Sequence, residues 1–164
     1  MDYKTPVMGA FMRAIGFEVS KANGEGVEGS VEISPDHHQP MGLVHGGVYS
    51  AVAESACSIG ASLAVMDDGK YSVGLNNSTD FIRAFREGTL TVKAWPVHQG
   101  RTGQLWQCDM TREDGKLVAQ GKVKRHGFDE TPKLGHKRGG KRRIIIARVR
   151  YKTVDAQGDT DVIS

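Results

Sequence analysis

Hydrophobic and polar residues alternate with two different periods in the first part of the chain. Residues 7–17 carry apolar side chains at helical spacing, with Val7, Phe11 and Ile15 on one face. Residues 26–34, with the sequence GVEGSVEIS, instead place apolar side chains at every second position, as a β-strand does. The chain is therefore predicted to begin with a short amphipathic helix followed by a strand.

Four segments in the second half of the chain also have the period of strands. In one of them, Trp106, Cys108 and Met110 share a side that is opposite to Leu105. The sequence Glu-Asp-Gly at residues 113–115 is a hairpin turn signal between the last two segments. The predicted strands are residues 71–81, 88–98, 103–112 and 116–125.

Between these two regions, residues 46–64 lack proline and are long enough for about five helical turns. Twelve of these 19 residues are Gly, Ala or Ser. Glycine and serine weaken a helix, but all three residue types allow close contact on most sides. The pattern predicts a buried central helix against a sheet. One such helix with mostly antiparallel strands around it is an α+β architecture.

Composition narrows the class of protein and its compartment. A chain of 164 residues with 38% hydrophobic and 25% charged residues is expected to fold as one domain with a substantial core. Cys57 and Cys108 are the only cysteines and lie in apolar segments, so neither a disulfide scaffold nor a zinc site is expected. With no signal peptide pattern and no apolar run long enough for a membrane span, we expect a cytoplasmic protein.

The net charge of +3 is unevenly distributed. Residues 132–164 contain nine of the 22 basic and three of the 19 acidic residues, so this segment carries +6 and the remainder −3. The strand pattern ends near His126. We therefore predict a domain at residues 1–126 and a basic, mobile extension at 127–164, in which residues 144–151 could add a strand. The basic run lacks interleaved aromatic residues, so nucleic acid is not an expected partner.

The most informative stretch is residues 39–58, QPMGLVHGGVYSAVAESACS. Glu54 is its only formally charged residue and lies within the helix predicted to be buried. Burying an unpaired carboxylate is costly, so such a group usually has a partner or a function. Two structural explanations stay open beside a catalytic one: Glu54 could face a solvated seam, or it could pair with a basic residue distant in the sequence.

The residues around Glu54 suggest carbonyl chemistry. Gly46 and Gly47 open the helix, where free backbone N–H groups could hold a developing oxyanion, or they could merely allow the sharp turn. Gln39 and His45 precede the helix and can each donate a hydrogen bond. Gly46 and Glu54 are eight residues apart, about 12 Å along a helix. Within one helix, this distance is too long for both residues to contact the same substrate atom from the same side.

The chain resembles the hotdog-fold thioesterases over roughly residues 8–125. The resemblance rests on QPMGLVHGG, the AVAES that follows, VGLNNSTDFIRAFREG and HQGRTGQLWQCDMTREDGKLVAQG in that order. The similar branch includes the Arthrobacter-type 4-hydroxybenzoyl-CoA, the 1,4-dihydroxy-2-naphthoyl-CoA and the phenylacetate-pathway thioesterases. It implies a long helix wrapped by an antiparallel sheet and active sites at a dimer interface, in a homodimer or homotetramer.

The resemblance also implies a role for each matching residue. Glu54 corresponds to the catalytic carboxylate, acting as nucleophile or as general base on water, and the Gly46 N–H to the oxyanion donor. Gln39 and His45 would orient or polarise the thioester carbonyl, and Ser58 would assist water or position the acyl group. The substrate is then an aromatic or medium-chain acyl-CoA, with neither cofactor nor metal.

Residues that contact the substrate are implied more loosely. Arg83 and Arg101 are the expected phosphate ligands of coenzyme A, unless they are simply surface charges. Asn76 and Asp80 would line the acyl pocket of the neighbouring subunit. The full implied set is Gly47, Gly74, Asn76, Asp80, Phe81, Ile82, Arg83, Ala84, His98, Gly100, Arg101, Thr102 and Gly103.

Two other functions stay open at this point. A non-catalytic hotdog module could bind acyl-CoA and use the basic extension to contact a partner, although such a module would not require the surroundings of Glu54. A hotdog dehydratase would act on acyl-CoA through an Asp/His pair placed differently. The leading hypothesis is hydrolysis of acyl-CoA.

Overall fold

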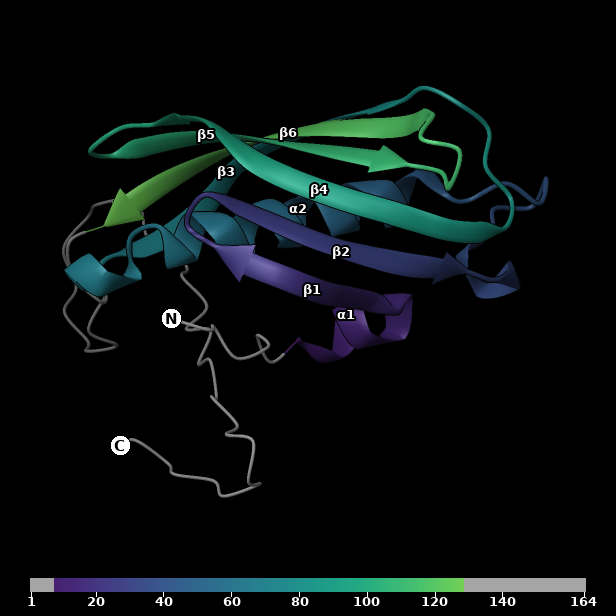
Figure 1. The fold of residues 1–164 in the computed structure, drawn as a ribbon, viewed down its shortest axis with the longest axis horizontal. Helices are drawn as coiled ribbons and strands as arrows, with labels where there is room; N and C mark the ends of the chain where they lie inside the picture. The colour runs from purple at the N-terminus through teal and green to yellow at the C-terminus, as the bar shows by residue number, and fades with distance from the viewer. Residues whose placement is uncertain (1–7, 129–164) are drawn as a thin grey trace, which may run out of the picture.

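One long helix packs against the concave face of a six-stranded antiparallel sheet in the computed structural model, which describes residues 8–128 (Figure 1). The sheet curves over this helix, and a short helix lies beside the first strand. The elements are α1 (Ala10–Ile15), β1 (Phe17–Asn23), β2 (Gly26–Ile33), η1 (Pro35–His37), α2 (Gly46–Leu63), η2 (Met66–Asp68), β3 (Tyr71–Phe81), β4 (Gly88–Gln99), β5 (Gly103–Thr111) and β6 (Leu117–Phe128).

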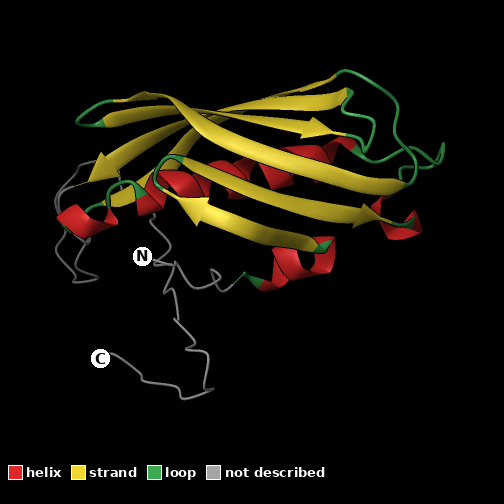
Figure 2. Cartoon of the chain, viewed as in Figure 1, coloured by secondary structure: helices red, strands yellow, loops and turns green. Residues whose placement is uncertain are grey.

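The strands are ordered β1-β2-β4-β5-β6-β3, and every neighbouring pair is antiparallel. Figure 2 shows α2 lying under the sheet, crossed by the strands. β3 follows α2 in the sequence but pairs with β6, so it forms one edge of the sheet. This arrangement is the α+β hotdog architecture that the sequence predicted.

Small residues let α2 approach the sheet closely. A Cβ atom added at Gly60 would lie 2.4 Å from the ring of Trp106, and one added at Gly121 would lie 2.6 Å from the Cβ of Ala53. Trp106 is fully buried and fills the space that Gly60 leaves. The many small residues of α2 are therefore explained by packing, as the sequence predicted.

The beginning of the chain differs from the prediction. The helix predicted at residues 7–17 is shorter, because Gly16 takes a left-handed φ of 70° that ends α1 and Phe17 already belongs to β1. Phe11, expected on the apolar face, is 67% exposed, whereas Met12 and Ile15 are buried. Val7 lies outside the described residues.

The prediction also missed a strand. β1 pairs with β2 in a hairpin whose turn is closed by the Asn23 side chain, which accepts hydrogen bonds from Glu25 N at 2.9 Å and Gly26 N at 2.8 Å. The Asn-Gly at residues 23–24 was the available hairpin signal. The other predicted strands and the long helix are confirmed, each within a few residues at its ends.

The remaining predictions concern the C-terminal extension, the two cysteines and a membrane span. The extension is predicted to begin at residue 127, but β6 continues to Phe128. The rest of the predicted extension, including its candidate strand at 144–151, lies outside the described residues. Both cysteines are free and buried. None of the helices in residues 8–128 combines the length and apolar character needed to cross a membrane.

Candidate active site

Glu54 lies midway along α2, and donors restrain both oxygens of its carboxylate. Oε1 accepts hydrogen bonds from Arg125 Nη1 at 2.9 Å and from Ser58 Oγ at 3.3 Å. Oε2 accepts one from Asn77 Nδ2 at 3.2 Å. The Glu54 side chain is nevertheless 40% exposed. The carboxylate is therefore held in place while it remains accessible to a substrate or water.

Arg125, on β6, is the partner that the sequence reasoning did not identify. Its side chain is 5% exposed and forms an ion pair with Glu54. Of the two structural explanations left open for Glu54, pairing with a distant basic residue is confirmed. The periodicity of β6 could have revealed it, because Val123 faces the core and Arg125 follows two residues later.

The strand β3 supplies the remaining contacts of this cluster. Asn77 donates both to Glu54 and to the backbone oxygen of Ser50, the latter at 3.0 Å. A Cβ atom added at Gly74 would lie only 2.7 Å from Glu54 Oε1. Gly74, which is expected near coenzyme A, lies directly beside the carboxylate. Ser58 lies one turn from Glu54 on α2, as the spacing predicted.

The N-terminus of α2 forms a second group of candidate residues. His45 is the N-cap, and its Nδ1 accepts a hydrogen bond from Gly47 N at 2.8 Å. An imidazole that accepts at Nδ1 carries its proton on Nε2 when neutral, so Nε2 is the nitrogen able to donate to a carbonyl. A Cβ atom added at Gly46 would lie 2.7 Å from the Phe81 ring, so a larger residue here would require that ring to move.

The loop that leads into α2 is held by hydrogen bonds to distant segments. His37 is buried, and its Nδ1 accepts from Ser34 N at 2.9 Å, which leaves Nε2–H to donate to Ile15 O at 2.8 Å. His45 N donates to His37 O at 2.8 Å. The Gln39 amide oxygen accepts from Met41 N, so its amide nitrogen is the group available to a ligand.

A pocket of about 330 Å³ opens at this end of α2. Tyr49 lies in it with its ring 5.9 Å from that of Phe81, and burial raises the pKa of Tyr49 to about 12. The pocket brings together many of the predicted site residues. Its lining residues are Gln39, Leu43, Val44, Gly46, Tyr49, Phe81, Ile82, Arg83, Ala84 and Phe85.

Glu54 does not line this pocket. Because α2 is continuous from Gly46 to Leu63, Gly46 and Glu54 remain about 12 Å apart along its axis. The described residues therefore contain two separate groups of candidate residues. The α2 N-terminal group consists of Gln39, His45 and Gly46. The Glu54 cluster consists of Glu54 and its three donors, Ser58, Asn77 and Arg125.

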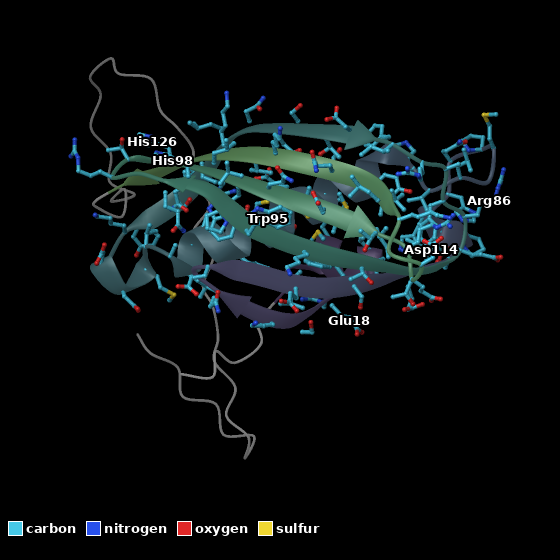
Figure 3. The ribbon with its side chains drawn as sticks, turned by 45° about the horizontal axis from the view of Figure 1, so that its top comes forward. Glu18, Arg86, Trp95, His98, Asp114 and His126 are labelled. Carbon is cyan, nitrogen blue, oxygen red and sulfur yellow. The ribbon has the colours of Figure 1, made fainter. Side chains whose placement is uncertain are left out.

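Most of the residues expected near coenzyme A line one of two hollows. Figure 3 shows His98 at the same end of the sheet as His126, and Arg86 and Asp114 at the opposite end. Arg83 lines the pocket at the start of α2 and donates to Leu117 O at 2.6 Å. Arg101 lies in another hollow of about 530 Å³, lined by Leu75, His98, Gly100, Arg101, Thr102, Gly103, Gln104, Leu105, Lys124 and Arg125.

Asn76 and Asp80, the residues expected to reach a neighbouring subunit, are exposed on the edge strand β3. Among residues 8–128, no three His, Cys, Asp or Glu side chains are grouped so that they could hold a metal ion. The Glu54 cluster consists of a carboxylate and hydrogen-bond donors, and the α2 N-terminal group consists of backbone and side-chain donors. A carboxylate can in general act as a base or a nucleophile, and grouped N–H donors can bind an oxyanion.

Comparisons with known proteins agree with this architecture. The family model described as "Thioesterase superfamily" matches residues 41–119. The Mycobacterium tuberculosis protein Rv1847 is 34% identical over 124 residues, covering 74% of this chain and 89% of that protein. Its solved structure has a TM-score of 0.73 at 33% identity and covers 76% of this chain and 100% of that chain.

Two relatives have more specific names. The 1,4-dihydroxy-2-naphthoyl-CoA hydrolase of Listeria monocytogenes is 35% identical over 105 residues, which cover 63% of this chain and 84% of that enzyme. The proofreading thioesterase EntH of Cronobacter turicensis is 30% identical over 109 residues, covering 66% and 79%. The chain therefore belongs to the thioesterase superfamily and is a thioester hydrolase of the hotdog fold.

Proposed function

We propose that this protein hydrolyses an aromatic or medium-chain acyl-CoA to the free acid and coenzyme A, with Glu54 as the catalytic carboxylate. The observation that carries the proposal is the Glu54 carboxylate itself, restrained by three donors yet 40% exposed. A carboxylate with no catalytic use is usually either solvated at the surface or buried in its ion pair.

The chemistry needs two groups acting on one carbonyl. As general base, Glu54 takes a proton from water while the water oxygen attacks the thioester carbon; as nucleophile, it forms a mixed anhydride that water then hydrolyses to the free acid. In both routes the C–S bond breaks and the thiolate of coenzyme A leaves. The backbone N–H of Gly46 stabilises the oxyanion that forms, and Gln39 and His45 orient the carbonyl through their free donors. Ser58 donates to Glu54 and assists in positioning it.

The separation of about 12 Å between Gly46 and Glu54 along α2 supports a site built from two chains. Glu54 of one protomer would then act opposite Gly46 of its partner in a homodimer or homotetramer. The edge strand β3 carries Leu75 and Phe81, which are both exposed and apolar, and such a strand is suited to pair with a second copy.

The substrate class draws on both the pocket and the relatives. Tyr49 and Phe81 supply aromatic rings to the pocket of about 330 Å³ beside Gly46, a size suited to an aromatic or medium-chain acyl group. The name of the Listeria relative specifies an aromatic acyl-CoA. Arg83 and Arg101 are the proposed phosphate contacts. The free cysteines support a cytoplasmic location.

The test is a panel of aryl-CoA and fatty acyl-CoA substrates, with release of the free thiol as the readout. On the best substrate, Glu54→Gln is expected to lower kcat by about 10²- to 10⁴-fold, because it keeps the shape of the side chain but removes the base. Glu32→Gln, at an exposed position of β2, is the matched control. Wild-type turnover by the Glu54→Gln enzyme would overturn the mechanism.

A further inference from the structure

Arg125 has more contacts than an ordinary ion pair requires. Its Nη1 donates to Glu54 and also to the Ser58 hydroxyl. Its Nε donates to Ser72 Oγ at 3.3 Å, and its Nη2 donates to Ser72 O at 2.9 Å. All three guanidinium nitrogens are therefore engaged, and they join α2 to the edge strand β3.

This set of contacts makes the guanidinium a rigid support for the carboxylate. An arginine side chain loses little additional freedom once its planar group is fixed at several points. Ser72 holds one side of the plane, so Nη1 is directed at Glu54 Oε1. The ion pair itself contributes little to the stability of the fold, because the free energy of desolvating the buried guanidinium offsets much of the electrostatic attraction to Glu54.

The two oxygens of Glu54 consequently differ. Oε1 accepts from both Arg125 and Ser58, whereas Oε2 accepts, among residues 8–128, from Asn77 alone, at 3.2 Å. A charge-assisted hydrogen bond stabilises the negative charge on the oxygen that accepts it. Oε2 therefore remains the better placed oxygen for attack on a carbonyl or for removing a proton from water.

We propose that Arg125 is a positioning residue for the hydrolytic reaction: together with Ser72 it fixes Glu54 through Oε1 and leaves Oε2 to react. The inference rests on the proposed role of Glu54. Arg125 acts through Glu54 and is not assigned any contact with the reacting atoms. It also lies beyond residues 41–119, the segment that the family model matches.

The first experiment separates kcat from KM in Arg125→Gln and Arg125→Lys. Misplacing a catalytic group by about 1 Å can cost 10²-fold in rate, so Arg125→Gln is expected to lower kcat by about that factor and change KM less than threefold. Arg125→Lys, which keeps the charge and one donor, is expected to recover part of the loss. Lys122→Gln, at an exposed position of the same strand, is the control.

Two results of this experiment would overturn the proposal. An unchanged kcat in Arg125→Gln would show that Glu54 needs no such support. A raised KM with unchanged kcat would make Arg125 a residue for binding coenzyme A. If Arg125→Gln does not fold, Ser72→Ala replaces it: this variant loses only the hydroxyl that accepts from Arg125 Nε, and it is expected to lower kcat about tenfold. An unchanged kcat there would equally contradict the proposal.

A double-mutant cycle with Glu54→Gln distinguishes positioning from a separate effect. If Arg125 acts only through Glu54, adding Arg125→Gln to Glu54→Gln causes no further loss in single-turnover rate. Additive losses would overturn the inference. Full activity in Glu54→Gln would instead defeat the proposed function itself, whereas an inactive Glu54→Gln beside a fully active Arg125→Gln would defeat only the role of Arg125.

Discussion

Individual residues decide how closely groups can approach Glu54. The side chain of residue 74 would point at the carboxylate, and only glycine leaves Oε1 its place, since a Cβ atom there would lie 2.7 Å away. At the start of α2, a Cβ atom at residue 46 would likewise lie 2.7 Å from the Phe81 ring. In both places a residue with a Cβ atom would have to displace the neighbouring side chain.

Gly74→Ala is therefore expected to lower kcat at least about tenfold, because the new methyl group displaces Glu54 from its hydrogen bonds. Stability should fall as well, because displacing Glu54 weakens its ion pair with the buried Arg125. Steady-state kinetics and thermal unfolding of the same preparation measure both effects. Gly127→Ala, on the neighbouring β6, controls for an added methyl group, because a Cβ atom there would lie no nearer than 3.8 Å to another atom, Tyr71 O. Equal kinetics in the two variants would contradict the explanation.

Tyr49 provides a prediction about pH. Because burial raises the pKa of its phenol to about 12, the folded protein keeps it neutral at a pH where an unfolded chain, with a tyrosine pKa near 10, would ionise it. The stability contributed by neutral Tyr49 is complete below about pH 10 and is lost as the pH rises to about 12.

Absorbance near 295 nm (characteristic of tyrosinate) is the measurement. Tyr49→Phe should remove the component of the titration that appears latest, near pH 12. Its unfolding free energy should also fall less than that of the wild type between about pH 10 and 12. If the lost component titrates near pH 10 instead, burial does not control this phenol.

Among the elements, α2 depends on small residues where it meets the sheet. Gly60 lies against the ring of Trp106, and Ala53 lies against Gly121. Glycine lowers the intrinsic stability of a helix by about 1 kcal/mol relative to alanine, so its presence inside α2 is explained by packing and not by helix formation. The same close contact holds Glu54 within reach of β3 and β6.

Gly60→Ala is accordingly expected to lower the free energy of unfolding by about 1–3 kcal/mol, because overpacking against Trp106 outweighs the gain in helix propensity. Urea unfolding measures the change. Ser62→Ala, a partly exposed position on the same helix, should stay within about 0.5 kcal/mol of the wild type. A more stable Gly60→Ala would mean that α2 can move away from the sheet at little cost.

At the scale of the whole molecule, β3 connects the site to the proposed assembly. It contributes Asn77 and Gly74 to the Glu54 cluster and forms one edge of the sheet. It also carries Leu75, which is 60% exposed. An edge strand with an exposed apolar residue, beside the proposed catalytic carboxylate, suits a site that is completed by a second copy of the chain.

Leu75→Lys is expected to weaken this assembly, because it places a charge on the apolar edge. Sedimentation velocity should show a larger monomer fraction at the same concentration, and turnover per chain should fall on dilution. Val97→Lys, at an exposed apolar position on β4, is the control. If Leu75→Lys leaves both the sedimentation and the dilution behaviour unchanged, the β3 edge is not the interface.

Local pattern was sufficient for much of this structure. The small-residue stretch from residue 46 predicted α2, and strand alternation predicted β2 and the four strands after α2. The lone charge at Glu54 pointed to the centre of the site. Each of these signals repeats within a few residues, since the helical and strand periods are properties of the backbone itself.

Only the tertiary structure decided how Glu54 is held. Arg125 and Asn77 are distant from it in the sequence, and they reach it because β6 pairs with β3 and both pack against α2. The register of that strand pair places Gly74 opposite Arg125. The sequence by itself therefore determined which residue is the unusual charge and which elements surround it. Its partners depend on strand order and register, which non-local pairing sets and no local period encodes.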